Sequence, residues 1–146
     1  MTEQPAIAFP ALGIAKEDSM SLWQSLDNER TCSLYAFVKG YWNRLTLFDA
    51  SGMRWEVAEA IPTRKISTLA KWLAPICYNP HIKVKLRFKD PRPYELGEVQ
   101  KLICWLIDRD DDIMTQFVEA DVLKTDVRTA TSFTDLIALL TKSHAV

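Results

Sequence analysis

The nearest approach to a nucleophilic pair in this chain is Cys77 and His81, which lie four residues apart. A histidine beside a cysteine can accept the thiol proton and leave a nucleophilic thiolate. Pro80 lies between the two and prevents the helical turn that would bring positions i and i+4 together. No third group is marked to orient the histidine. We therefore interpret the pair as a loop histidine beside a buried cysteine, and we assign no catalytic residue.

The acidic run DRDDD at residues 108–112 offers oxygen ligands of the kind that divalent cations prefer. Counted from Asp108, Glu119 falls at the twelfth position of an EF-hand loop, where a glutamate is required. Ile113, however, replaces the glycine that the sixth position needs for its sharp turn. The aspartates are better explained as caps in a solvated turn between helices, so we expect no metal site.

The chain contains no complete match to the sequence patterns that bind phosphate or RNA. Its four glycines, Gly13, Gly40, Gly52 and Gly97, are too far apart for a Walker loop or a dinucleotide fingerprint. The tetrapeptide YAFV at residues 35–38 matches the middle of the RNA-recognition octapeptide, but it lies too early in the chain and leads into a predicted hairpin rather than a helix. We therefore expect no cofactor, and we do not favour a nucleic-acid partner.

Residues 81–89, HIKVKLRFK, alternate apolar and cationic side chains without interruption. This period of two predicts a strand whose apolar face points to the core. Its other face carries four cations: Lys83, Lys85, Arg87 and Lys89. We favour a face that is solvated or paired with Glu56 and Glu59 of a neighbouring strand. An acidic protein partner is the next interpretation, and binding of nucleic acid is the third.

Aromatic side chains form a second candidate binding feature. Residues 32–42, CSLYAFVKGYW, are rich in aromatic and β-branched types and predict a strand. Surplus aromatic surface often marks a binding face, and ordinary core packing is the simpler alternative. The candidate partner-binding face combines aromatic residues on one face of this strand with the cations of residues 81–89: Tyr35, Phe37, Tyr41, Lys83, Lys85, Arg87 and Lys89.

The elements that must position these side chains predict an α+β fold. The strand at 32–42 and the segments RLTLFDA and MRWEVAEAI form an antiparallel β-meander, with a turn at Asp49–Gly52. A short helix from Ser67 to Leu73 and the cationic strand follow. We expect a mostly antiparallel sheet of about four strands, followed by three C-terminal helices packed on one face.

The C-terminal helices are predicted from their apolar stripes and caps. One spans YELGEVQKLICWLIDRD, one runs from Glu119 to Thr129, and one follows the capping box at Ser132–Asp135. A further short helix would hold Ile113 and Phe117 after a cap at Asp111 or Asp112.

The length of 146 residues suits one core. Residues 1–18 contain Pro5, Pro10 and Gly13 and few large apolar side chains, so we expect a flexible arm followed by a single domain at 19–146. The three cysteines form no CxxC motif, which argues against a disulfide framework or a zinc site. Without a basic signal-peptide region or a long apolar run, the chain is expected to be soluble and cytoplasmic, with no membrane partner.

The net charge of −1 conceals an uneven layout, with −3 over residues 1–62, +6 over 63–95 and −4 over 96–146. We expect a non-enzymatic protein-interaction module that binds a protein partner or associates with itself as a homo-oligomer. Its profile resembles that of bacterial immunity and adaptor proteins, a likeness that no particular residue carries. The alternative is a small enzyme or small-ligand-binding protein with a dispersed polar site such as His81, Arg87 and Glu56. The second alternative is nucleic-acid binding through residues 83–89.

Overall fold

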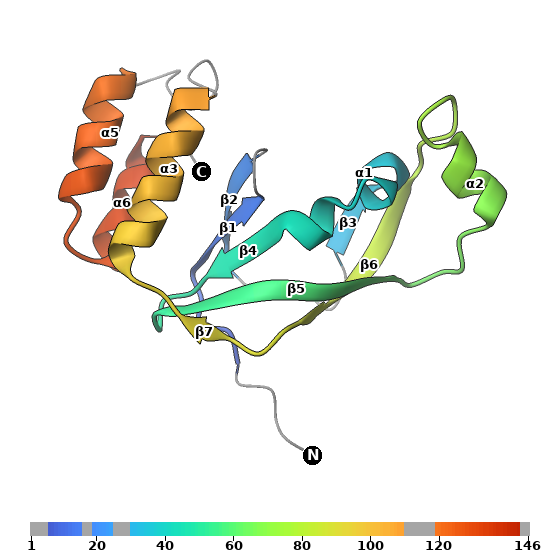
Figure 1. Ribbon diagram of the computed structural model, residues 1–146, viewed down its shortest axis with the longest axis horizontal. Helices are drawn as coiled ribbons and strands as arrows, with labels where there is room; N and C mark the ends of the chain where they lie inside the picture. Colours follow the sequence, from blue (N-terminus) through green and yellow to red (C-terminus); the bar gives the residue numbers. More distant parts are fainter. Residues whose placement is uncertain (1–5, 16–18, 25–29, 110–118, 144–146) are drawn as a thin grey trace.

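The computed structural model describes residues 6–15, 19–24, 30–109 and 119–143. The fold is α+β, as predicted, with a curled antiparallel sheet in the middle of an elongated molecule (Figure 1). Helices α3 (Leu96–Arg109), α5 (Ala120–Thr129) and α6 (Phe133–Lys142) lie at one end, and α2 (Thr68–Leu73) lies at the other.

Within the described residues the sheet has seven strands, so the prediction of about four strands was too low. Six strands follow the order β2-β1-β4-β5-β6-β3, and β7 pairs with β5. The strands are β1 (Ala11–Ala15), β2 (Ser19–Trp23), β3 (Arg30–Ser33), β4 (Leu45–Phe48), β5 (Met53–Pro62), β6 (His81–Phe88) and β7 (Arg92–Pro93). All pairings are antiparallel, and β1, β2 and β7 are the strands that the prediction omitted.

Strand β1 lies within the segment that was expected to be a loose arm. All five of its residues are buried, and it pairs with β2 on one side and β4 on the other. A strand covered on both faces shows no alternation of apolar and polar residues, so ALGIA carried no strand signal. Gly13 is required here, because a Cβ at this position would lie 2.7 Å from Nε1 of Trp23.

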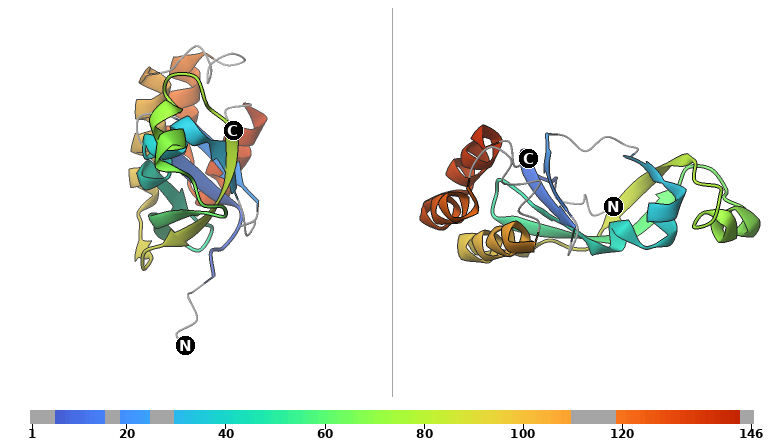
Figure 2. Two further views of the ribbon diagram at one scale, coloured as in Figure 1. Left: turned by 90° about the vertical axis from the view of Figure 1, so that its right-hand side faces the viewer. Right: turned by 90° about the horizontal axis from the view of Figure 1, so that it is seen from above.

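Two hydrophobic clusters occupy the two faces of the sheet. The first lies between β1, β4 and the C-terminal helices, and it includes Leu12, Phe48, Ile103, Ile107, Leu123 and Leu136. The second lies on the other face, around which the sheet curls (Figure 2), and it includes Trp23, Trp42, Leu47, Trp55, Val57, Val84 and Phe88. Three of the five tryptophans are therefore core residues, as the simpler interpretation of the aromatic surplus predicted.

The predicted strand at 32–42 is wrong beyond Ser33. Its predicted place in a β-meander is also wrong, because β3 pairs with β6, and β4 pairs with β1 and β5. Helix α1 (Leu34–Val38) and the 3-10 helix η1 (Tyr41–Arg44) replace the strand beyond Ser33. The Ser33 hydroxyl accepts a hydrogen bond from the amide of Ala36 at 3.1 Å, and Gly40 joins the two helices at a φ of 76°. A cap and a glycine turn thus override the β propensity of the aromatic residues.

The predicted turn at Asp49–Gly52 and the predicted cap at Ser132 are confirmed, whereas Ser67, predicted to begin the short helix, caps it instead. The Asp49 carboxylate accepts hydrogen bonds from the amides of Ser51 and Met53, and Gly52 has a φ of 87°. Ser67 and Ser132 cap α2 and α6 through their hydroxyls. The predicted short helix with Ile113 and Phe117, and its caps at Asp111 or Asp112, fall outside the described residues.

Candidate functional site

Exposed apolar side chains gather on the segment of residues 63–80, which connects β5 to β6 and contains α2. Leu69, Trp72, Ile76 and Tyr78 are 65%, 69%, 68% and 50% exposed, respectively. The spacing of i, i+3 and i+7 places Leu69, Trp72 and Ile76 on one side of the helix and its final turn. We call these four side chains the α2 surface. The segment projects away from the C-terminal helices, at the opposite end of the molecule (Figure 1).

Local hydrogen bonds hold this segment in place. Ser67 caps the start of α2 by accepting from the Ala70 amide at 3.1 Å. At its end, the amides of Ile76, Cys77 and Tyr78 all donate to the Leu73 carbonyl. Its apolar surface is therefore displayed on a hydrogen-bonded turn of helix.

Helix α1 anchors the end of the same segment. The amide of Leu34 donates to the carbonyl of Pro80 at 2.8 Å, and the amide of Tyr35 donates to Oδ1 of Asn79 at 2.8 Å. Tyr35 and Val38 of α1 are also exposed. The α2 surface and the exposed side of α1 thus lie at the same end of the molecule.

The short helix predicted from Ser67 to Leu73 rests on the helical spacing of Ile66, Leu69, Ala70 and Leu73. The structure exposes Leu69 and half-buries Leu73. Trp72, which lies outside that stripe, is the most exposed of the large apolar side chains. An aromatic residue outside the stripe of a short helix is the signal by which the sequence could have indicated this surface.

The segment that carries the α2 surface lies in a stretch of sequence with charges of one sign. Residues 60–89 contain no aspartate or glutamate, and they contain seven cations: Arg64, Lys65, Lys71, Lys83, Lys85, Arg87 and Lys89. Lys71 lies in the last turn of α2 itself. Arg64, His81 and Lys83 line one hollow of about 310 Å³ at the base of the segment. The apolar surface is therefore bordered by positive charge.

The cationic strand is confirmed, and its alternation matches the burial of its residues. Arg87 and Lys89 pair with the predicted glutamates. Arg87 Nη2 lies 2.8 Å from Glu59 Oε2, and Lys89 Nζ lies 3.8 Å from Glu56 Oε2. These two cations are half of the strand's positive face, and exposed pairs of this kind contribute little to stability.

The seven residues of the predicted partner-binding face do not form one surface. Tyr35 is exposed on α1, whereas Phe37 and Tyr41 pack against the second hydrophobic cluster. Tyr41 also makes an edge-on contact with Trp42, with ring centroids 5.1 Å apart. The four cations, Lys83, Lys85, Arg87 and Lys89, remain exposed along β6.

The dispersed polar site is not assembled either. Glu56 lines a cavity beside α3, His81 lines the hollow below α2, and Arg87 pairs with Glu59. Cys77 is exposed, so its expected burial was wrong. Within the described ranges, no three or more His, Cys, Asp or Glu side chains are grouped closely enough to hold a metal ion.

Cys104 is buried and Cys32 is partly buried, and both environments disfavour the thiolate. Burial raises the pKa of Cys32 above its ordinary value, and a hydrogen bond from Trp42 Nε1 at 3.2 Å lowers it only in part. Burial and then the nearby Asp108 carboxylate raise the pKa of Cys104, although Arg128 lowers it. A raised pKa disfavours the thiolate, which is the nucleophilic form of each side chain.

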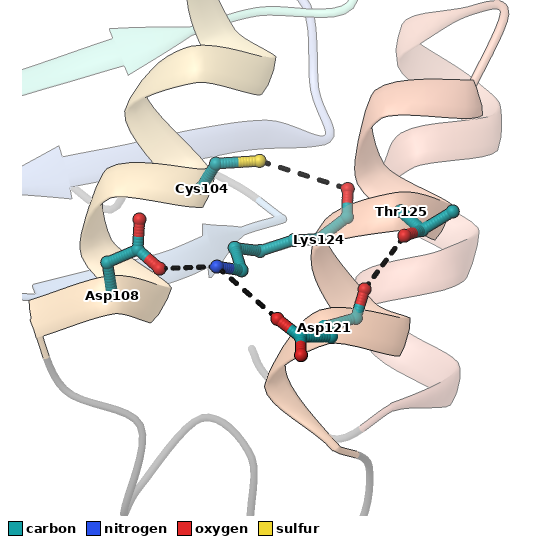
Figure 3. A network of polar contacts seen from close by, with 5 residues as sticks. All are labelled: Cys104, Asp108, Asp121, Lys124 and Thr125. Atoms are coloured by element: carbon teal, nitrogen blue, oxygen red, sulfur yellow. Dashed lines mark hydrogen bonds and ion pairs between the residues drawn. The ribbon is translucent and has the colours of Figure 1, made fainter.

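Cys104 lies at the junction of α3 and α5, shown in Figure 3. Its Sγ lies 3.9 Å from the Lys124 carbonyl oxygen. The Lys124 ammonium lies 2.6 Å from Asp108 Oδ1 and 3.7 Å from Asp121 Oδ1. The hydrogen bond to Asp108 raises the pKa of Lys124. This network joins two helices of the bundle. Cys104 and Asp108 also line a surface hollow of about 460 Å³ beside Gln100 and Arg128.

A cavity of about 420 Å³ lies between α3 and the helix-facing side of the sheet. Ile14, Phe48, Leu102, Trp105 and Leu106 form its apolar lining. Charged side chains from η1, β5, α3 and the end of β6 complete the wall. A cavity of this size falls within the range of about 300–1,000 Å³ that small-molecule sites occupy.

Comparison of the chain with protein-family models, curated proteins and solved structures gave no match. Across the described part of the chain, no helix combines the length and the apolar character needed to cross a bilayer.

Proposed function

We propose that the chain is a non-enzymatic protein-interaction module that binds an acidic protein through the α2 surface. The observation that carries this proposal is the exposure of four large apolar side chains within ten residues, each at least half accessible. Single exposed apolar residues are ordinary, but a contiguous group marks an interaction site. Trp72 and Tyr78 belong to the types that anchor protein interfaces.

The cations near the α2 surface indicate the chemistry of the partner. Seven cations and no acid occur between residues 60 and 89. A partner with apolar side chains surrounded by carboxylates would complement this surface and would be steered to it over long range. The paired cations, Arg87 and Lys89, lie farther along β6 and contribute less.

Association of two copies through the same surface is less favourable. A two-fold interface places the same patch of both subunits face to face. Lys71 and its neighbours would then meet the same cations of the other copy, which opposes docking. An acidic partner avoids this repulsion.

Nucleic acid also matches the surface less well. Single-stranded nucleic acid requires aromatic rings that stack with successive bases. Two of the four side chains of the α2 surface, Leu69 and Ile76, are aliphatic. The mixture of aliphatic and aromatic groups is typical of a protein interface.

The experiment compares matched variants in binding to a partner captured from the source cell extract, identified and then purified. Leu69→Ser removes an apolar group from the α2 surface, and Val122→Ser removes one of 48% exposure from α5 as a control. Lys71→Glu reverses a charge on α2, and Lys101→Glu does so on α3. Leu69→Ser should weaken binding about tenfold or more, and Lys71→Glu should mainly slow association.

The control variants should bind as the wild type does, and added salt should weaken binding. Equal effects of Leu69→Ser and Val122→Ser would overturn the location of the site. Concentration-dependent sedimentation that Leu69→Ser abolishes would identify a second copy as the partner. Oligonucleotide binding whose logarithmic affinity falls linearly with the logarithm of salt concentration would instead favour the nucleic-acid alternative.

A further inference from the structure

The cavity beside α3 lies far from the α2 surface, at the end of the molecule that the C-terminal helices cover (Figure 1). Its volume is about 420 Å³. Ile14 and Phe48 of the sheet form one apolar wall, and Leu102, Trp105 and Leu106 of α3 form the opposite one. Such a space accepts a flat or narrow apolar group between a sheet and a helix.

Four of the five charges that line the cavity are arranged in two pairs. Arg54 Nη1 lies 2.7 Å from Glu98 Oε1, and this pair links β5 to α3. Lys89 Nζ lies 3.8 Å from Glu56 Oε2. Each pair is neutral as a whole, so neither gives the cavity a net charge.

Arg44 is the fifth charge of the lining. It ends the 3-10 helix η1 and is exposed. Among the residues that the structure describes, no carboxylate lies within ion-pair distance of its guanidinium. The cavity therefore carries one unbalanced positive charge at an accessible position.

Arg54 adds an unused donor to the same wall. Its Nε is buried and has no hydrogen-bond acceptor. A buried donor without a partner is unfavourable and is rare in folded proteins. Because Nε is buried, a ligand oxygen would reach it only after the side chain turns toward the cavity that Arg54 lines, while Nη1 is paired with Glu98.

We propose that this cavity binds a small monocarboxylate with an apolar body. The carboxylate accepts hydrogen bonds from Arg44 and Arg54, and the apolar body lies between the sheet and Leu102 and Trp105. A guanidinium and a carboxylate make a strong, charge-assisted pair. A neutral ligand would leave Arg44 unbalanced, and a cationic ligand would be repelled by it.

The test uses three eight-carbon probes of similar size: octanoate, octanamide and octylamine. Isothermal titration calorimetry measures their affinities for the full chain, and chemical-shift changes locate the site. Octanoate should bind about tenfold or more tightly than octanamide, because a charged hydrogen bond is lost in the amide. Octylamine should bind least.

Two variants assign the effect to this cavity. Arg44→Gln removes the unbalanced charge and should weaken octanoate binding about tenfold while leaving octanamide unchanged. Lys142→Gln removes a cation from α6 and should change neither affinity. Leu102→Trp fills the apolar part of the cavity and should abolish binding of both probes, provided that thermal unfolding shows a folded variant.

The proposal is overturned if octanoate does not bind at millimolar concentration, or binds no more tightly than octanamide. It is also overturned if Arg44→Gln has no effect on octanoate. Carboxylate binding in the cavity and protein binding at the α2 surface can be tested independently, because Leu69→Ser should leave octanoate affinity unchanged.

Discussion

Asp49 is a buried carboxylate that organises the turn between β4 and β5. Its two oxygens accept from the amides of Ala8, Ser51 and Met53, from the Ser51 hydroxyl and from Trp55 Nε1. Burial alone would raise its pKa, but these hydrogen bonds together lower the pKa below its ordinary value. The carboxylate is thus stabilised in its charged form inside the fold.

Asp49→Asn should reduce the free energy of unfolding by about 2–3 kcal/mol at neutral pH, because the amide cannot accept all of these bonds. The folded-state pKa is depressed, so the stabilisation is complete above the ordinary carboxyl pKa of about 4 and is lost as the pH falls through the lower folded value. Urea unfolding of both proteins between neutral and acidic pH measures the difference. The difference in unfolding free energy between the wild type and Asp49→Asn should become smaller as the pH falls. A difference that is absent, or that does not change with pH, would contradict the stabilising role of the Asp49 carboxylate.

Gly13 provides a second prediction for a single residue. A Cβ at this position would lie 2.7 Å from Trp23 Nε1 and 3.2 Å from Leu47 Cδ2, both in the second hydrophobic cluster. Gly13→Ala should therefore lower the unfolding free energy by about 1–3 kcal/mol. Gly97→Ala is the control, since nothing lies within 4 Å of its Cβ, and in α3 it should be neutral or stabilising. Equal effects in thermal unfolding would refute the close packing of Trp23.

At the scale of elements, amphipathic segments were predictable and a strand buried on both faces was not. The helices α5 and α6 show apolar stripes in the sequence because one side of each faces water. Strand β6 shows alternation for the same reason. Strand β1 contacts apolar groups on both faces, so its short run of small and apolar residues resembled the interrupted segment around it.

Strand β1 should be essential to stability. Leu12 is fully buried against the helices, so Leu12→Ala should cost about 2–5 kcal/mol of unfolding free energy. Leu69→Ala, on the exposed α2 surface, should change it by less than about 0.5 kcal/mol. Chemical denaturation compares the two. A small loss for Leu12→Ala would show that β1 is dispensable, as an arm at 1–18 would be.

The candidate site was predictable only in part from the sequence. Helix α2 followed from the periodicity of its apolar residues, but its cap at Ser67 was not predicted. Whether another layer covers its apolar side depends on distant parts of the chain, which local spacing does not encode. The acid-free run at residues 60–89 was visible, but its relation to Trp72 required the placement of α2 beside the start of β6.

At the scale of the whole molecule, the two ends of the sheet differ in how they are covered. Three helices cover β1 and β4 at one end and bury a continuous core. At the other end the chain leaves the sheet after β5, exposes the α2 surface and returns as β6 (Figures 1 and 2). This asymmetry leaves one end available for a second protein to cover, which is the central claim of the proposed function.

Cross-linking from a single position tests that claim most directly. A photo-reactive phenylalanine derivative replaces Trp72 in one protein and Val122 in another, and each protein is illuminated in the source cell extract. From position 72 we expect one predominant cross-linked protein of acidic composition, whose yield falls with salt and with Lys71→Glu. From position 122 we expect none of it. The same products from both positions, or no product from position 72 under conditions where the partner is retained by the wild type, would contradict the assignment of the α2 surface as the binding site.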